Sequence, residues 1–189
     1  MRLYDADSGR IYIDGRDIRS IPKKELYSMF GVAFQNDFLY KGTLEENIKF
    51  HRNISRDAIC DALEISRASG FVSEDKNGLA REITTGGTNL SGGQKQRSLI
   101  ARAVAGNPDI IILDDSSSAL DYKTDLELRR AIKSKLKSTT VIVSQRIASV
   151  MSADKILVIE DGRIIGAGRH EELLRNCDIY KQIADVQMI

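Results

Sequence analysis

The sequence predicts an α/β fold, in which a parallel-sheet core is interrupted by a helical subdomain and preceded by an antiparallel β hairpin. Three short apolar runs, at 110–113, 140–143 and 155–159, predict core strands, and a helical pattern separates the first two. From about residue 43 the sequence changes to helical periodicity, which predicts the subdomain. An Asp-Gly pair after alternating apolar residues at 10–13 predicts the hairpin.

The first half of the chain contains one further strand and two helix starts. Residues 30–34 (FGVAF) predict a strand that runs directly into Gln35. Thr43 begins a Thr-x-x-Glu capping box, and Ser55 is placed to cap the following helix. We therefore expect a mostly helical insert from about 36 to about 98.

The second half alternates helices and strands. Residues 95–105 predict a helix that ends at a Gly-Asn-Pro sequence. Apolar residues at every fourth position from 128 to 136 predict another helix before the strand at 140–143. An Asp-Gly turn at 161–162 predicts a second hairpin, and 171–187 supplies closing helical segments.

Composition excludes several classes of protein. The 28 Lys and Arg residues balance 27 Asp and Glu residues, and the net charge of +1 favours neither nucleic acid nor anionic lipid as a partner. No apolar stretch is long enough to span a bilayer and no signal peptide begins the chain, so we expect the chain itself to be soluble. Cys60 and Cys177 lack metal-ligand spacing, which favours reduced thiols.

Two segments predict phosphate and magnesium chemistry. Residues 90–94 (LSGGQ) place a serine and two glycines at the start of a helix, where backbone N–H groups and the helix dipole attract an anion. Residues 109–115 (DIIILDD) form an apolar run that delivers two carboxylates to the edge of a sheet. Taken alone, the first could be a Gly-rich turn, and the second a carboxylate pair at a strand end.

Five motifs in order resemble the ATP-binding domain of ABC transporters over nearly the whole chain. They are a signature motif at 90–97 (LSGGQKQR), a Walker B strand at 110–114 (IIILD), a D-loop at 118–121 (SALD), a Q-loop glutamine at Gln35 and an exporter-type segment at 39–48 (LYKGTLEENI). The resemblance implies a RecA-like P-loop NTPase core, with ATP and Mg²⁺ as cofactors. It implies an ATPase that drives export through fused or associated membrane domains.

The resemblance also assigns roles to individual residues. In that family two domains pair head to tail, and the signature of one contacts the nucleotide held mainly by the other. The implied nucleotide-binding residues are Ser91, Gly92, Gly93, Gln94 and Asp121; the implied metal-binding residues are Asp114 and Gln35; and the implied catalytic residues are Asp115, Gln145 and Gln35.

The chain departs from the family pattern in four places. No Gly-Lys pair occurs, so the P-loop motif is absent, and we expect a domain truncated at its amino terminus. Asp115 stands where the family usually has a catalytic glutamate, and Gln145 where it has a histidine that could carry a proton. Thr85 stands near the position of a glutamate in many exporters. Gln145 could also be a solvated polar residue after a strand.

These departures predict the degenerate half of a heterodimeric exporter. Asp115 and Gln145 would serve the chain's own site, whereas the intact signature would serve the partner's site. The expected partners are a second ABC ATP-binding domain and transmembrane domains, without nucleic acid, at the cytoplasmic face of the plasma membrane. An alternative is a non-hydrolytic regulatory or structural half that is inactive alone. A DNA-repair or chromosome-maintenance ATPase is disfavoured, because no sustained heptads join Gln35 to Ser91.

The expected organisation is one partial ATP-binding domain over 1–189. Within it, 1–35 is the β-rich remainder of the amino-terminal core and 36–98 the helical subdomain with the Q-loop and signature. Residues 99–175 form the second half of the RecA-like core, and 176–189 a carboxyl-terminal helix.

Overall fold

The computed structural model describes residues 1–116 and 118–187, which form two compact units. The first unit is Met1–Val141 and the second Ile142–Ile189. Each unit has its own hydrophobic core.

The first unit begins with the predicted hairpin of β1 (Tyr12–Ile13) and β2 (Arg16–Asp17). Its turn residues Asp14 and Gly15 have φ values of 48° and 77°, the left-handed backbone that two-residue hairpin turns require. The short helix α1 (Lys23–Ser28) follows. A small core joins these parts through buried apolar side chains, namely Ile18, Ile21 and Leu26.

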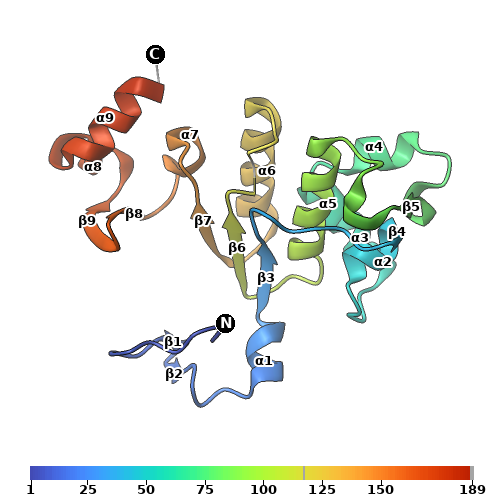
Figure 1. Ribbon diagram of the computed structural model, residues 1–189, viewed down its shortest axis with the longest axis horizontal. Helices are drawn as coiled ribbons and strands as arrows, with labels where there is room; N and C mark the ends of the chain where they lie inside the picture. Colours follow the sequence, from blue (N-terminus) through green and yellow to red (C-terminus); the bar gives the residue numbers. More distant parts are fainter. Residues whose placement is uncertain (117, 188–189) are drawn as a thin grey trace. The chain divides into compact units, whose positions relative to one another are not determined.

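The central sheet has the strand order β3-β6-β7, with β3 (Phe30–Ala33), β6 (Ile110–Asp114) and β7 (Thr139–Val143) (Figure 1). Strands β3 and β6 run parallel, with Ala33 opposite Leu113. Their carboxyl ends therefore meet at one edge, which brings Gln35 close to the acidic end of β6. The predicted parallel core is confirmed for this pair.

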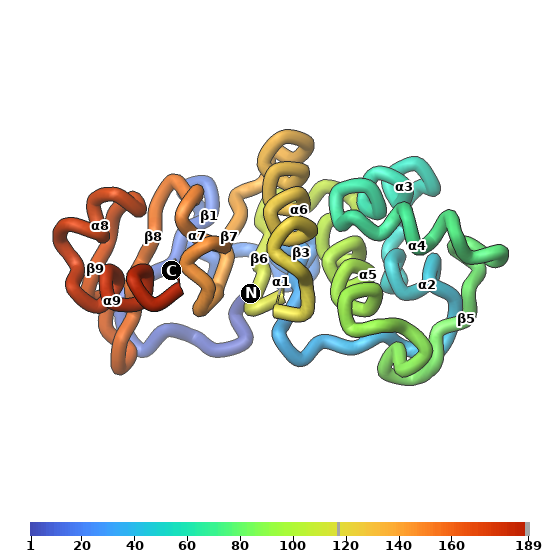
Figure 2. Tube along the Cα trace, turned by 90° about the horizontal axis from the view of Figure 1, so that it is seen from above, coloured from blue at the N-terminus to red at the C-terminus, as the bar shows by residue number. Residues whose placement is uncertain are grey.

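The segment 36–98 forms helices α2 (Leu44–Lys49), α3 (Arg56–Ile65) and α4 (Ser69–Glu74), and α5 (Gly92–Val104) follows the signature serine. Figures 1 and 2 show these four helices gathered on one side of the sheet. The predicted caps are confirmed: the Thr43 hydroxyl accepts from Glu46 N, and the Ser55 hydroxyl from Ala58 N. Helix α5 begins three residues earlier than expected, because Ser91 caps it.

The insert is less purely helical than expected. It also contains the two-residue strands β4 (Gly42–Thr43) and β5 (Glu82–Ile83), and the 3-10 turns η1 (Gly78–Ala80) and η2 (Thr85–Gly87). β4 and β5 pair antiparallel. Two residues are too few to show a strand period in sequence, so this pairing was invisible there.

Helix α6 (Tyr122–Lys135) leads from the acidic strand end to β7. Leu128 and Ile132 are buried as the fourfold spacing predicts. Leu136 is the residue after the last helical turn and has an extended backbone, so it closes the helix instead of extending its apolar face.

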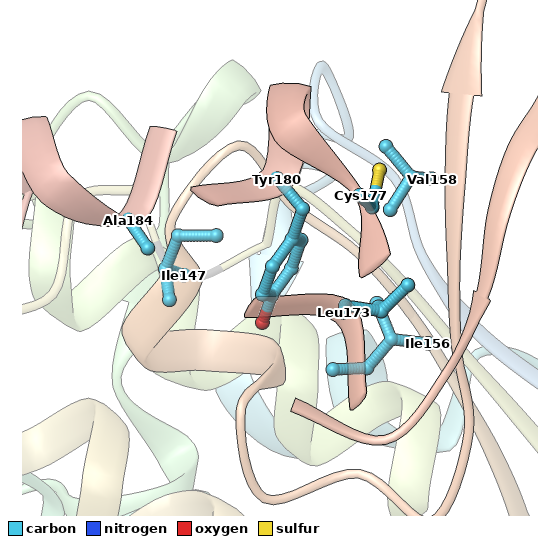
Figure 3. Close-up of a cluster of buried hydrophobic side chains, with 7 residues drawn as sticks. All are labelled: Ile147, Ile156, Val158, Leu173, Cys177, Tyr180 and Ala184. Atoms are coloured by element: carbon cyan, nitrogen blue, oxygen red, sulfur yellow. The ribbon is translucent and has the colours of Figure 1, made fainter. Parts of the chain in front are cut away.

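The second unit contains α7 (Ile147–Val150), the hairpin of β8 (Ile156–Glu160) and β9 (Arg163–Gly168), α8 (His170–Asn176) and α9 (Asp178–Gln187). The hairpin turn at Asp161 and Gly162 has positive φ, as predicted. Helices and hairpin share the buried core in Figure 3, formed by Ile147, Ile156, Val158, Leu173, Cys177, Tyr180 and Ala184.

The closing helical segment is two helices, because Cys177 has an extended backbone with φ −133°. The helix predicted over 176–189 is α9 from 178 to 187, and residues 188 and 189 lie outside the described residues. His170 Nδ1 lies 2.8 Å from the Tyr180 hydroxyl, a buried contact that holds α8 to α9. Among the helices of the described residues, none combines the length and apolar character that crossing a membrane requires.

Gly31 permits the close approach of β3 to α5, which predicts a selective cost of substitution. A Cβ there would lie 1.9 Å from the Ala103 carbonyl oxygen and 2.7 Å from Pro108 Cγ. We expect Gly31→Ala to lower the free energy of unfolding by about 1–3 kcal/mol, measured by urea denaturation.

Gly70→Ala is the matched control. Gly70 lies within α4 and a Cβ there would have no neighbour within 4 Å. That variant should be neutral or more stable by about 0.5–1 kcal/mol, because alanine is the better helix former. Equal loss of stability in both variants would contradict the close approach.

Candidate functional site

The amino terminus of α5 presents hydrogen-bond donors at the protein surface. Ser91 Oγ accepts a hydrogen bond from Gln94 N at 3.2 Å, and Gln94 Oε1 accepts from Ser91 N at 3.1 Å. This capping box leaves the serine O–H proton free to be donated elsewhere. The N–H groups of Gly92 and Gly93 belong to the first helical turn, which lacks intrahelical acceptors. Ser91 and Gly92 are exposed, so the positive end of the helix faces solvent.

The signature residues pack beside the segment that follows the acidic strand end. Ala119 N donates to Gln96 Oε1 at 3.4 Å. A Cβ placed on Gly93 would lie 3.6 Å from the Ala119 carbonyl oxygen, an ordinary contact distance. The structure thus brings together the predicted signature and the described part of the predicted D-loop.

Asp121 acts as the amino-terminal cap of α6. Its Oδ1 accepts from Thr124 N at 3.0 Å and its Oδ2 from Thr124 Oγ1 at 2.6 Å. The Thr124 hydroxyl first, and then the Thr124 backbone N–H, hold the pKa of the Asp121 carboxyl below its ordinary value. Both carboxylate oxygens are therefore engaged within the chain, and a contact of Asp121 with nucleotide stays a prediction.

Gln35 and Asp115 meet at the carboxyl edge of the sheet. Gln35 Nε2 donates to Asp115 Oδ2 at 3.3 Å, across 80 residues of sequence. Asp115 has a φ of 43°, a left-handed backbone that aspartate tolerates better than most residues. Gln35 is exposed, whereas Asp114 and Asp115 are half-buried. The parallel pairing of β3 with β6 therefore brings the predicted Q-loop residue to the predicted catalytic position.

The donor chemistry of this edge fits Mg²⁺ held together with a nucleotide. With its amide nitrogen on Asp115, Gln35 has its carbonyl oxygen left for a cation or a water. Asp114 adds a carboxylate at the end of β6, and Mg²⁺ prefers such oxygen ligands. Among the described residues, no group of three or more His, Cys, Asp or Glu side chains could hold a metal by itself. Mg²⁺ sites commonly use one or two carboxylates together with substrate phosphates and water.

Gln145 belongs to the second unit, directly after β7. Its side chain is exposed, and its backbone oxygen accepts from Gln187 Nε2 at 2.8 Å. Gln187 Oε1 in turn accepts from Ile147 N at 2.8 Å. The carboxyl-terminal helix α9 therefore fixes the backbone at Gln145 and leaves its amide free for other contacts. A catalytic role for Gln145 stays a prediction.

Two buried polar residues near the loop that follows Gln35, Asn47 and Arg102, were not predicted from the sequence. They are 3% and 6% exposed, and they join α2 and α5 to the loop that follows Gln35. Burial lowers the pKa of Arg102, while the nearby Asp37 carboxylate raises it. A charged residue within the otherwise apolar end of the helix predicted at 95–105 was the signal that could have identified Arg102.

A groove of about 610 Å³ is lined in part by Tyr40, Asn47 and Phe50. Two of its lining rings, those of Tyr40 and Phe50, are neighbours with centroids 5.4 Å apart. The ring of Phe38, outside the lining, lies 4.7 Å from that of Tyr40. The segment 39–48, which predicted an exporter, thus contributes Tyr40, Lys41, Glu46 and Asn47 to the lining of an open groove of mixed polar and aromatic character.

Comparisons with known proteins agree with the motifs and the fold. Residues 1–118 match the ABC transporter family. An ABC transporter ATP-binding protein of Bacillus subtilis is 44% identical over 187 residues, which cover 98% of this chain and 32% of that protein. The ATP-dependent lipid A-core flippase of Vibrio vulnificus is 38% identical over 189 residues, again 98% of this chain and 32% of the relative.

Among solved structures, a bacterial Atm1-family ABC exporter with ATP bound matches with a TM-score of 0.93 and 32% identity. The match covers 100% of this chain and 34% of the exporter chain. The chain therefore spans about a third of the length of these relatives. This match confirms the predicted fold class, an α/β P-loop NTPase fold with a helical subdomain and an amino-terminal hairpin. The chain belongs to the ABC transporter family and is an exporter-like ATP-binding domain.

Proposed function

We propose that the chain works as one half of a head-to-tail pair with a second ABC ATP-binding domain, and that it supplies its signature to the nucleotide of that partner. The observation that carries this proposal is the exposed start of α5. There the Ser91 hydroxyl only accepts a hydrogen bond within the chain, from Gln94 N, so its proton is left to donate, and the N–H groups of Gly92 and Gly93 lie in the first helical turn, which lacks intrahelical acceptors.

The chemistry of that helix start suits the γ-phosphate of ATP. Donors at a helix amino terminus bind a phosphate through N–H groups, and the helix dipole adds about half a positive charge. Ser91 adds an O–H donor. A phosphate held across an interface stabilises the pair, and its release after hydrolysis removes that stabilisation. The signature would thereby link the chemistry of one domain to the association of two.

The chain's own acidic edge suits binding better than hydrolysis. Asp115 is shorter than glutamate by about 1.5 Å, one C–C bond, and a general base must lie within hydrogen-bond reach of its water. One oxygen of the Asp115 carboxylate already accepts from Gln35 Nε2. Gln145 lacks a proton that titrates near pH 7. Together these features support a degenerate site that binds Mg²⁺ and nucleotide, through Asp114 and Gln35, but turns over slowly.

The membrane partners follow from the relatives. Two of the matched proteins are described as a lipid A-core flippase and an Atm1-family exporter. We infer that this chain likewise acts with transmembrane domains of an exporter, at the cytoplasmic face of the plasma membrane. We expect the groove lined by Tyr40 and Phe50, next to the Gln35 loop, to contact such a partner and to transmit nucleotide binding to it. A purely structural half that binds no nucleotide is the alternative.

ATP binding by the 189-residue chain alone provides the first test. The sequence contains no P-loop motif, so the phosphate cradle and its lysine are absent. Titration with Mg²⁺-ATP, followed by calorimetry, should give weak or undetectable binding. A dissociation constant in the micromolar range would contradict the inference that binding depends on a phosphate cradle that these 189 residues do not contain.

The signature prediction is tested in the exporter complex that contains this chain. Ser91→Ala should lower ATP turnover by about 100-fold, the usual cost of removing one donor to a transition-state oxygen. It should also destabilise the chain by about 1 kcal/mol, because the cap is lost. Turnover is measured by phosphate release at saturating ATP.

Ser55→Ala is the matched control. Ser55 Oγ accepts from Ala58 N at 3.2 Å, the same cap geometry as Ser91, but at α3. It should cost similar stability and leave turnover near wild type. Equal turnover losses in the two variants would show that Ser91 acts only as a helix cap. Replacement of the partner domain's catalytic glutamate by glutamine should abolish turnover, and substantial activity surviving it would overturn the asymmetric pair.

A further inference from the structure

We propose that Arg102 is the positioning residue for Gln35. Its guanidinium holds the loop that follows Gln35 against helix α5, and so keeps the Gln35 amide on Asp115. The inference concerns this contact itself. Only its consequence for nucleotide sensing rests on the proposed function.

The Arg102 guanidinium is fixed on three sides by the segment 37–47. Arg102 Nη1 donates to the Phe38 carbonyl oxygen at 3.1 Å and lies 3.5 Å from Asp37 Oδ1. Arg102 Nε donates to the Asn47 carbonyl oxygen at 2.9 Å, and Nη2 to Asn47 Oδ1 at 3.0 Å. One side chain on α5 thus binds both ends of the segment that joins the Gln35 loop to α2.

Asn47 adds hydrogen bonds to the middle of the segment 37–47. Its Oδ1 also accepts from Tyr40 N at 2.8 Å, and its Nδ2 donates to the carbonyl oxygens of Tyr40 at 2.9 Å and Thr43 at 3.0 Å. Because Arg102 Nη2 shares the Asn47 oxygen, the two side chains form one buried network. Such a network stabilises one backbone arrangement when all its members are paired.

Aromatic faces complete the Arg102 environment. The guanidinium carbon lies 4.7 Å from the ring centroid of Phe50 and 5.7 Å from that of Tyr40. A planar guanidinium can stack on a ring and donate along its edge at the same time, which a lysine ammonium cannot do. Arg102→Lys therefore keeps the charge but should lose most of these hydrogen bonds and ring contacts.

The residues that Arg102 binds lie close to Gln35 in the chain, which explains how Arg102 can position Gln35. Phe38 is three residues beyond Gln35, so the anchored carbonyl lies within about 10 Å of chain from it. Asp37 N donates to the Phe34 carbonyl oxygen at 3.3 Å, which folds the intervening residues into a turn. Gln35 thus sits between two fixed points, the end of β3 and the Arg102 anchor. Loosening the anchor should allow the 3.3 Å contact from Gln35 to Asp115 to open.

Arg52 offers a matched control from the same neighbourhood. Its guanidinium donates to the carbonyl oxygens of Ile48, Arg102 and Ala105, at 3.1, 2.6 and 3.1 Å. These contacts join the end of α2 to the end of α5 and involve none of the residues 36–41. Arg52→Lys should therefore disturb the helix ends without moving Gln35.

The test uses NMR of the full chain, with the side-chain amide resonances of Gln35 as the readout. Asp115→Asn serves as the reference that removes the carboxylate acceptor. Arg102→Lys should move the Gln35 amide resonances toward their Asp115→Asn positions and speed amide exchange of Tyr40 by at least 10-fold. Adding Arg102→Lys to Asp115→Asn should shift the Gln35 resonances little further, whereas Arg52→Lys should leave them in place.

Asp37→Asn is a second, milder variant in case Arg102→Lys disturbs folding. It weakens the ion pair from the loop side without altering α5, and should shift the Gln35 resonances in the same direction by a smaller amount. Unchanged Gln35 resonances in a folded Arg102→Lys chain, or equal shifts in Arg52→Lys, would overturn the proposal. The readout needs no ATPase activity, so failure of the proposed function would leave this result standing on its own.

Discussion

The close packing of α5 on β3 is the constraint on which the rest of the first unit depends. Gly31 lets the helix backbone approach the strand, and the buried face of α5 includes Ile100, Ala101 and Val104. With the helix fixed on this strand, its amino terminus presents the signature residues and its carboxyl-terminal half carries Arg102. A single packing contact therefore sets the position of the helix start that we propose binds phosphate and of the arginine that we propose anchors the Gln35 loop.

The fold was largely readable from the sequence where the signals are local. Thr43, Ser55 and Ser91 cap helices as their spacing predicts, and both Asp-Gly pairs form tight hairpin turns. The pairing of β4 with β5 was not readable, because two-residue strands carry no periodicity. The break at Cys177 was located only to within two residues, by the predicted boundary at 175–176, since neither glycine nor proline marks it.

The candidate site was predictable in its residues but not in its contacts. Motif order identified Gln35, Ser91 and Asp115, yet only the parallel register of β3 and β6 brings the first and the last of these together. The position of Arg102 in an apolar helix end was a signal in the sequence, but its pairing with Asn47 was not predictable, because it consists of hydrogen bonds across more than 50 residues. Long-range polar networks follow from tertiary packing, and composition or periodicity cannot encode them locally.

The direction of the chain's own hydrogen bonds gives Ser91 and Asp115 different chemistry. At Ser91 the chain's own bonds use the hydroxyl as an acceptor, which leaves its proton for an incoming anion. At Asp115 the chain's own bond uses a carboxylate oxygen, which leaves less of that group to accept a proton from water. A donor-rich helix start suits a phosphate that arrives across an interface. A carboxylate already paired with Gln35 suits a site that senses whether its ligands are in place. The fold therefore leaves a proton available at Ser91 and fewer lone pairs available at Asp115. This difference supports the unequal roles we propose, phosphate binding at Ser91 and slow turnover at Asp115.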